Sequence, residues 1–345
     1  TTVICIGIDD YPRVEVSESV SSYFGTSVYD PFRGLETDSK ESQAWLESQQ
    51  RLTDSYLAGT GYQSFVEDVV TESLDYRRLS TPQISDDYLY YFLNQGLEDH
   101  SALYRSPPDG DVIEDKEVFI RPALFDGDDA SITSYDVSDS GAYVAVLVSS
   151  DGQDWRRLHV FDAQNCEEVI DPIDNVKFSG LSWIADEQVL FSVYPSSDNH
   201  ASMADSHELR ACNVETGDTR SVFGDSEDYQ FVRGFVSDDD AFIVVLAAQT
   251  TGGDAVYVKR VGDKSFTEYV AEEDFEFKFL GHVDEEVLFQ TNYDAPNKRV
   301  VSIPHDDPWR SAWTTVVEEH DRPMEVSSAG GYLFARILED ARHTV

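Results

Sequence analysis

A unit of roughly 45 to 53 residues repeats along most of the chain, and this period restricts the fold more than any other sequence feature. In each unit an apolar strand leads into a turn with Asp or Ser, and a second, stronger strand rich in Val, Ile, Tyr and Phe follows. The turns lie at Ser85-Asp86, Ser138-Asp139, Ala185-Asp186, Ser237-Asp238, Val283-Asp284 and Ser328-Ala329. The second strands are predicted at residues 88–93, 143–148, 189–194, 242–247, 287–290 and 332–337.

This period is that of a four-stranded propeller blade, about 40 to 50 residues. A single blade cannot bury both of its faces, so a ring of blades is the natural way to cover them. An array of immunoglobulin-like sandwiches would repeat at about 100 residues, roughly twice the observed period. We therefore predict an all-β β-propeller over residues 76–345, with five full units and the start of a sixth.

The first 75 residues have a different pattern. Apolar residues recur at helical spacing over residues 38–56, among helix-forming Glu, Gln and Arg, and again over residues 62–74. The second stretch carries an apolar stripe made of Phe65, Val66, Val69, Val70 and Leu74. Such a stripe is typical of a packing surface and not of a cofactor site. The sequence thus predicts a helical segment over residues 1–75 before the propeller.

The net charge restricts which partners the chain can bind and the salt concentration at which it is stable. The chain has 67 acidic and 25 basic side chains and a formal net charge of −42, with the acids scattered singly or in short groups. Such a surface repels itself in dilute buffer, but molar salt shortens the Debye length to about 3 Å and screens the repulsion. This indicates a protein built for concentrated salt, as in a halophile. Nucleic acid is not an expected partner, because phosphates need basic contacts; a basic partner is the alternative.

The cellular compartment is predicted from the absence of a membrane helix and a signal peptide in this sequence. No apolar run approaches the roughly 18 residues of a membrane helix. The apolar stretch at residues 1–8 is short and has no basic start, unlike a signal peptide. Cys5, Cys166 and Cys212 are dispersed and form no C-x-x-C pair, so they are expected to be small buried apolar residues. We expect a soluble, cytoplasmic protein without contact to membranes.

Several motifs occur in the order found in one family of serine peptidases. Near the start these are Tyr23-Phe24-Gly25-Thr26, Asp30-Pro31-Phe32-Arg33, Leu35-Glu36 and Ala44-Trp45. Further on they are Val137-Ser138-Asp139-Ser140-Gly141, Asp154-Trp155, Val176-Lys177-Phe178-Ser179-Gly180 with Trp183, and Leu338-Glu339-Asp340-Ala341-Arg342. From about Tyr11 onward the chain resembles the prolyl oligopeptidases. It departs from them at Gly34, where the family usually has Trp, which affects one packing contact.

The resemblance implies an α/β-hydrolase domain and a seven-bladed propeller that caps its active site. In that family the N-terminal helices belong to the hydrolase, and the catalytic Ser, Asp and His lie C-terminal to the propeller. The sequence printed here ends within the sixth blade. We therefore expect a fragment, a truncated reading frame or a degenerate product that lacks the hydrolase domain and is inactive alone.

The residues present offer no convincing catalytic or metal site. A serine hydrolase of this class places its nucleophile on a G-x-S-x-G turn before a helix. The nearest match, around Ser182, lacks the last glycine and precedes a strand, so it predicts an ordinary blade residue. His200 and His207, with Asp205 and Glu208 nearby, match no zinc spacing and are predicted to lie on a surface loop. No metal or other cofactor is expected.

One residue has a functional interpretation, and it comes from the resemblance. In the family, the Phe of the Val-Lys-Phe-Ser motif reaches toward the region that binds the substrate's proline, and here this residue is Phe178. A large aromatic ring supplies apolar contact without chemistry; the alternative is an ordinary blade-core Phe. A family position that holds Cys in some members aligns loosely with Thr250, so no thiol chemistry is implied.

Together these observations give a functional hypothesis. The chain is the non-catalytic propeller part of a peptidase that cleaves short proline-containing peptides, and its propeller excludes folded proteins by size. Its main partner would be the missing α/β-hydrolase domain, which would supply acyl transfer through a Ser-His-Asp triad. The alternative is a stand-alone binding propeller without enzymatic activity, and a G-x-S-x-G in frame beyond Val345 would discriminate between the two. A third possibility, an enzyme with its own site on the propeller, rests only on the histidine pair.

Overall fold

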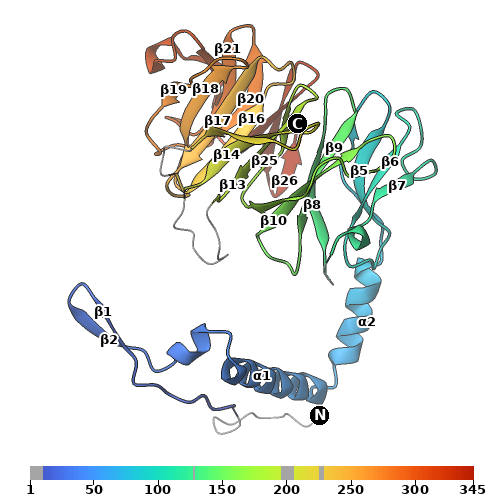
Figure 1. The fold of residues 1–345 in the computed structure, drawn as a ribbon, viewed down its shortest axis with the longest axis vertical. Helices are drawn as coiled ribbons and strands as arrows, with labels where there is room; N and C mark the ends of the chain where they lie inside the picture. Colours follow the sequence, from blue (N-terminus) through green and yellow to red (C-terminus); the bar gives the residue numbers. More distant parts are fainter. Residues whose placement is uncertain (1–10, 127–128, 196–205, 225–228) are drawn as a thin grey trace. The chain divides into compact units, whose positions relative to one another are not determined.

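The computed structural model describes residues 11–126, 129–195, 206–224 and 229–345. The described residues divide into two compact units. The first contains the residues up to Arg77 together with Gln95–Leu97, and the second contains Arg78–Asn94 and Glu98–Val345 (Figure 1). Cys5, His200 and Asp205 lie outside the described residues. Within the described part, no helix combines the length and the apolar character needed to cross a membrane.

The first unit is built from a hairpin and helices. Strands β1 (Val20–Tyr23) and β2 (Thr26–Tyr29) form the hairpin, and a short 3₁₀ helix at Arg33–Glu36 follows. Helix α1 (Lys40–Gly59) begins at a capping box, in which the Ser39 hydroxyl accepts the backbone N–H of Ser42 at 3.1 Å. Helix α2 (Gln63–Leu74) follows directly. The two predicted helical stretches are confirmed, with ends shifted by at most three residues.

The second unit is a row of antiparallel sheets, which we call the first to sixth blades. The first blade contains β3 (Arg78–Leu79), β4 (Gln83–Ile84), β5 (Leu89–Asn94), β6 (Ala102–Ser106) and β7 (Glu117–Ile120). The second contains β8 (Ser131–Val137), β9 (Tyr143–Ser149), β10 (Arg156–Asp162) and β11 (Ile173–Val176). The third contains β12 (Ser182–Ile184), β13 (Gln188–Val193), β14 (Glu208–Asn213) and β15 (Thr219–Phe223). Because β11 of the second blade also pairs with β13, the second and third blades form one continuous sheet.

The remaining blades follow the same order. The fourth contains β16 (Phe231–Val236), β17 (Phe242–Ala248), β18 (Ala255–Arg260) and β19 (Thr267–Val270). The fifth contains β20 (Phe277–Val283), β21 (Glu286–Thr291), β22 (Arg299–Pro304) and β23 (Thr314–Val317). The sixth contains β24 (Met324–Ala329), β25 (Tyr332–Glu339) and β26 (Arg342–Thr344). The six predicted second strands are β5, β9, β13, β17, β21 and β25, which confirms the propeller interpretation of the repeat.

Each pair of neighbouring blades encloses its own apolar core. For example, Leu147 and Leu158 of the second blade pack with Phe191 of the third, and Phe242 of the fourth blade packs with Phe289 of the fifth. Full burial of one such side chain contributes about 1.5 to 3 kcal/mol. Alternate residues of a strand point to opposite faces of the blade. In the second to fifth blades, one face therefore packs against the preceding blade and the other against the following blade.

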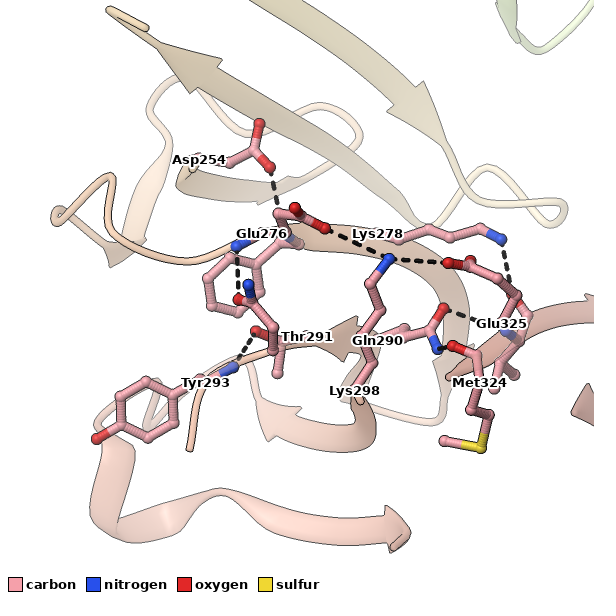
Figure 2. Close-up of polar contacts among 12 residues, drawn as sticks. Asp254, Glu276, Lys278, Gln290, Thr291, Tyr293, Lys298, Met324 and Glu325 are labelled. Carbon is pink, nitrogen blue, oxygen red and sulfur yellow. Dashed lines mark hydrogen bonds and ion pairs between the residues drawn. The ribbon is translucent and has the colours of Figure 1, made fainter. Parts of the chain in front are cut away.

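Polar contacts also cross the boundaries between blades. The boundary between the fifth and sixth blades is held by the buried amide of Gln290, which donates to the carbonyl of Met324 at 2.9 Å and accepts the N–H of Val326 at 3.1 Å (Figure 2). Lys298 bridges the same boundary, with its Nζ 3.3 Å from Glu276 and 2.8 Å from Glu325. At the boundary of the first and second blades, Gln83 donates to Asp136 at 2.7 Å.

Candidate functional site

A cavity of about 390 Å³ gathers residues from three successive parts of the propeller. They come from the connection after β11, from the fourth blade and from the start of the fifth. Its lining residues are Phe178, Phe231, Arg233, Ala248, Thr250, Thr251, Gly253, Asp254, Glu276 and Phe277. The cavity therefore contains both residues singled out from the sequence, Phe178 and Thr250.

Phe178 forms one wall of this cavity. Its backbone has a φ of 50°, in the left-handed region that costs a non-glycine residue about 1 to 2 kcal/mol. The residue is 38% exposed, and the centroid of its ring lies 5.4 Å from that of Phe231. The ammonium group of Lys177 lies 5.0 Å from the centre of the Phe178 ring and 4.9 Å from that of Trp155. Phe178 is thus not a blade-core residue, and its partly exposed ring is held between an aromatic and a cationic neighbour.

A second wall carries a charged pair. Arg233, on β16, has its Nη2 2.7 Å from Oδ1 of Asp254, and its side chain is 47% exposed. Asp254, labelled in Figure 2, is nearly buried. Its other oxygen accepts the N–H of Phe277 at 3.1 Å. Both carboxylate oxygens are therefore engaged, which fixes the Arg233 guanidinium at the cavity wall. Guanidinium donors suit carbonyl and carboxylate oxygens.

The loop between these walls depends on a glycine. A Cβ at Gly253 would lie 2.3 Å from the carbonyl oxygen of Glu273 and 2.6 Å from the nitrogen of Phe275, so a side chain has no room. The close approach allows the N–H of Asp254 to donate to the carbonyl of Phe275 at 2.9 Å. The loop that carries Thr250 and Thr251 is therefore locked against the segment that leads into the fifth blade.

The chemistry available in the cavity is recognition. Three phenylalanine rings offer apolar contact, Arg233 offers donors, and Thr250 and Thr251 offer hydroxyl groups. None of the ten lining residues is a His, Cys or Ser, so this wall offers no imidazole base or thiol to activate a nucleophile. The arrangement offers a bound molecule apolar contact, hydrogen-bond donors and hydroxyl groups.

The histidine interpretation needs a correction. His207 directly precedes β14 and is fully buried, so the prediction that it lies on a surface loop is wrong. Glu208 pairs with Arg210 at 2.9 Å and not with a histidine. Across the described residues, no group of three or more His, Cys, Asp or Glu side chains is placed to hold a metal ion. The expectation that the chain needs no cofactor stays a prediction.

The other sequence candidates have structural roles. Ser182 begins β12, a strand and not the start of a helix, and its hydroxyl accepts the N–H of Val236 at 3.1 Å. This agrees with its interpretation as a blade residue. Cys212 is buried, and Cys166 packs beside the core between the first and second blades. Both are free thiols, and burial raises the pKa of each above its ordinary value.

Sequence reasoning missed Phe231, Arg233 and Asp254. The stretch 231–236 has the pattern of an ordinary strand, and one arginine within it carries no local signal. The available hint was the position of Phe231 at the start of β16, the first strand of the fourth blade. Their convergence with Phe178 depends on the geometry of neighbouring blades, which no short motif encodes.

Comparison with known proteins identifies the family to which the chain belongs. Residues 12–345 match the model for the prolyl oligopeptidase N-terminal β-propeller domain. A prolyl endopeptidase of Elizabethkingia meningoseptica is 30% identical over 340 residues, which cover 96% of this chain and 48% of that protein. A dual function macrocyclase-peptidase of Galerina marginata is 26% identical, covering 85% of this chain and 45% of that protein. The chain spans about half the length of the curated relatives it matches.

Solved structures agree with the fold. A prolyl endopeptidase from a study of interdomain dynamics has a TM-score of 0.70 at 25% identity, covering 96% of this chain and 49% of that one. Prolyl oligopeptidase B from Galerina marginata, bound to a 25-residue macrocyclization substrate, has a TM-score of 0.83 at 23% identity, covering 95% and 51%. From its repeat, its motifs and these matches, the chain belongs to the prolyl oligopeptidase family, whose N-terminal β-propeller domain it contains.

Proposed function

We propose that the chain serves as the substrate-admitting propeller of a serine endopeptidase that cleaves short peptides after proline. Phe178 would contact the apolar part of a bound peptide near its proline. Family membership and the geometry of the cavity around Phe178 support this proposal. The catalytic steps would be carried out by an α/β-hydrolase domain, to which this chain contributes binding and exclusion by size.

The observation that carries the proposal is the conformation of Phe178. A partly exposed aromatic ring on a left-handed backbone is unfavourable on two counts, since both the strain and the exposure cost free energy. Such strain is typical of functional sites, where the surroundings hold it in place. The neighbouring Phe231 and Lys177 restrict the ring so that its free face stays available to a ligand.

The first unit supports a hydrolase partner. The stripe on α2 is solvent-exposed, with exposed fractions of 66% at Phe65 and 45% to 53% at Val66, Val69, Val70 and Leu74. A helix face this apolar is suited to packing against further protein. We propose that residues 1–75 pack on the α/β-hydrolase domain and that residues 76–345 form the propeller.

The working environment is part of the proposal. We infer a cytoplasm with concentrated salt, because 67 acidic side chains against 25 basic ones need screening. The apparent melting temperature should rise as KCl increases from about 0.1 M to 2 M. A flat or falling curve contradicts the inference. A sodium sulfate series at matched ionic strength is the control: screening is then similar, so any larger rise in sulfate measures the contribution of strengthened apolar burial.

Peptide binding tests the central proposal. We expect Phe178→Ala to weaken binding of a fluorescein-labelled octapeptide with a central Gly-Pro by about tenfold, the value of one buried aromatic contact. Anisotropy in 2 M KCl measures the affinity. Phe24→Ala is the matched control, because Phe24 is also an exposed aromatic with positive φ, 49°, but belongs to the first unit. Equal affinities for the two variants would refute the role of Phe178.

An activity assay tests whether this chain can catalyse peptide hydrolysis by itself. The 345 residues contain no G-x-S-x-G turn, so we expect only background hydrolysis of a chromogenic Gly-Pro substrate. Turnover that survives repurification and is abolished by a fluorophosphonate would show that the chain carries its own nucleophile.

A further inference from the structure

His207 occupies a position between three blades. Its imidazole is fully buried and stacks on the ring of Tyr194, with centroids 4.4 Å apart and planes 19° from parallel. Its backbone N–H donates to the carbonyl of Tyr229 at 2.8 Å. The ring therefore lies beside the connection that follows β11, the end of β13 and the start of β16.

Both ring nitrogens are bonded to the backbone. The N–H of Val232 donates to Nδ1 at 2.8 Å, and Nε2 lies 2.9 Å from the carbonyl oxygen of Lys177. A backbone N–H can only donate and a carbonyl can only accept, so Nδ1 is unprotonated and Nε2 carries the proton. Burial lowers the pKa of His207 to about 4, and the ring is neutral near pH 7. One tautomer satisfies both bonds.

The two backbone groups bonded to the imidazole belong to residues adjacent in sequence to Phe178 and Phe231, two of the three aromatic residues that line the cavity. Lys177 directly precedes Phe178, and Val232 directly follows Phe231. A rigid five-membered ring thus sets the distance between the segments that carry the two phenyl rings. It also holds the peptide unit just before the strained φ of Phe178, where the backbone would otherwise relax.

We propose that His207 is a positioning residue, which holds Phe178 and Phe231 at the spacing that grips a peptide. The inference rests on the proposed peptide-binding role of Phe178. It predicts that loss of the imidazole separates the two phenyl rings and weakens peptide binding, although His207 never touches the peptide.

The test compares His207→Ala with Tyr194→Phe in the full chain at 2 M KCl. Tyr194→Phe is the matched control, because it removes the hydroxyl bond to the carbonyl of Gln230 (2.6 Å), beside the same strand, but leaves both imidazole bonds intact. Nuclear Overhauser contacts between ¹³C-labelled Phe178 and Phe231 report the spacing of the rings, with assignment by single Phe→Leu variants. Anisotropy with the Gly-Pro octapeptide reports affinity.

We expect His207→Ala to lose the contacts between Phe178 and Phe231 and to bind the peptide at least tenfold more weakly. Tyr194→Phe should keep the contacts and bind within twofold of the unaltered chain. If His207→Ala does not fold, His207→Gln takes its place, since an amide can still donate to Lys177 but is not a rigid spacer. The inference is overturned if the contacts persist without the imidazole, or if affinity falls no further than in Tyr194→Phe.

The ring contacts separate this inference from the proposed function. If Phe178→Ala leaves peptide affinity unchanged, the peptide-binding role fails, yet the contacts still show whether His207 sets the spacing. If loss of the His207 imidazole removes the contacts and also weakens peptide binding, the positioning role of His207 and the peptide-binding role of Phe178 are both supported. A ¹⁵N spectrum of the His207 ring adds a direct check, because the required tautomer carries its proton on Nε2 near pH 7.

Discussion

The first and sixth blades are built from similar alternating strands, yet their outward faces differ. On the first blade, Tyr91 and Leu93 of β5 are fully buried on the face away from the second blade, together with Ala102 and Tyr104 of β6. The loop between β6 and β7 covers them, and the hydroxyl of Tyr91 donates to the carbonyl of Val112 at 2.7 Å. This blade supplies its own cover.

The sixth blade has no such cover within the described residues. One face of β25 packs on the fifth blade through Leu333, Ala335 and Ile337. On the other face Tyr332 is 73% exposed and Phe334 46%. Alternation in the sequence therefore specifies which residues share a face, but whether that face is buried depends on a neighbouring segment.

The largest expected effect is at the covered face. Tyr91→Ala should lower the free energy of unfolding by about 3 to 5 kcal/mol, because it leaves a cavity and an unpaired carbonyl. Tyr332→Ala should change it by no more than about 0.5 kcal/mol, since that ring is mostly in solvent. Urea unfolding in 2 M KCl measures both. Equal losses would mean that the loop does not hold the outward face of the first blade.

The blades and helices were predictable because each depends on local pattern. Burial against two neighbours imposes alternation on every second strand, and turn residues separate the strands at a fixed period. The cover of the first blade was not predictable, because the stretch Pro107–Gly110 carries turn residues typical of an exposed loop. In the candidate site, the resemblance identified Phe178. Phe231 and Arg233 escaped detection and His207 was wrongly predicted to lie on a surface loop, because their roles arise only where segments of different blades meet.

A second prediction contrasts carboxylates at the first and last blade boundaries. Burial raises the pKa of Asp136, between the first and second blades, to about 6 from an ordinary value of 3.8. Above pH 6 this carboxylate is charged in both the folded and the unfolded chain, and its burial destabilises the fold. As pH falls from 6 toward 3.8 the folded chain takes up the proton first, so this destabilisation disappears.

Asp136→Asn should therefore stabilise the chain by about 1 to 2 kcal/mol at pH 7.5, with the gain vanishing near pH 4. The amide oxygen can still accept from Gln83. Glu325→Gln, which alters an exposed ion pair with Lys298 at the last boundary, is the control and should change stability by less than about 0.5 kcal/mol. Unfolding series at pH 7.5, 6 and 4 measure both variants. A gain for Asp136→Asn that is independent of pH would show that the carboxylate is not the cause.

Changes on the uncovered face of the sixth blade should affect stability least, but they should measurably affect association of the chain. Replacing both Tyr332 and Phe334 with Ser should change the free energy of unfolding by less than about 0.5 kcal/mol per site. An exposed apolar sheet face favours self-association, especially when salt screens the net charge of −42. Light scattering in 2 M KCl should therefore show concentration-dependent association of the unaltered chain and a mass nearer 38.8 kDa for the double variant.

The exposed stripe on α2 provides the control for that experiment, since it is a second apolar surface on the chain. Replacing Phe65 and Val69 with Ser removes a comparable apolar area from the first unit. If association runs through the sixth blade, this pair leaves the measured mass unchanged and the Tyr332 and Phe334 pair lowers it. The reverse result would assign association to α2. A sharp 38.8 kDa monomer for the unaltered chain at every concentration would mean that an uncovered blade face is tolerated in water, and burial at the two ends would then differ without consequence for assembly.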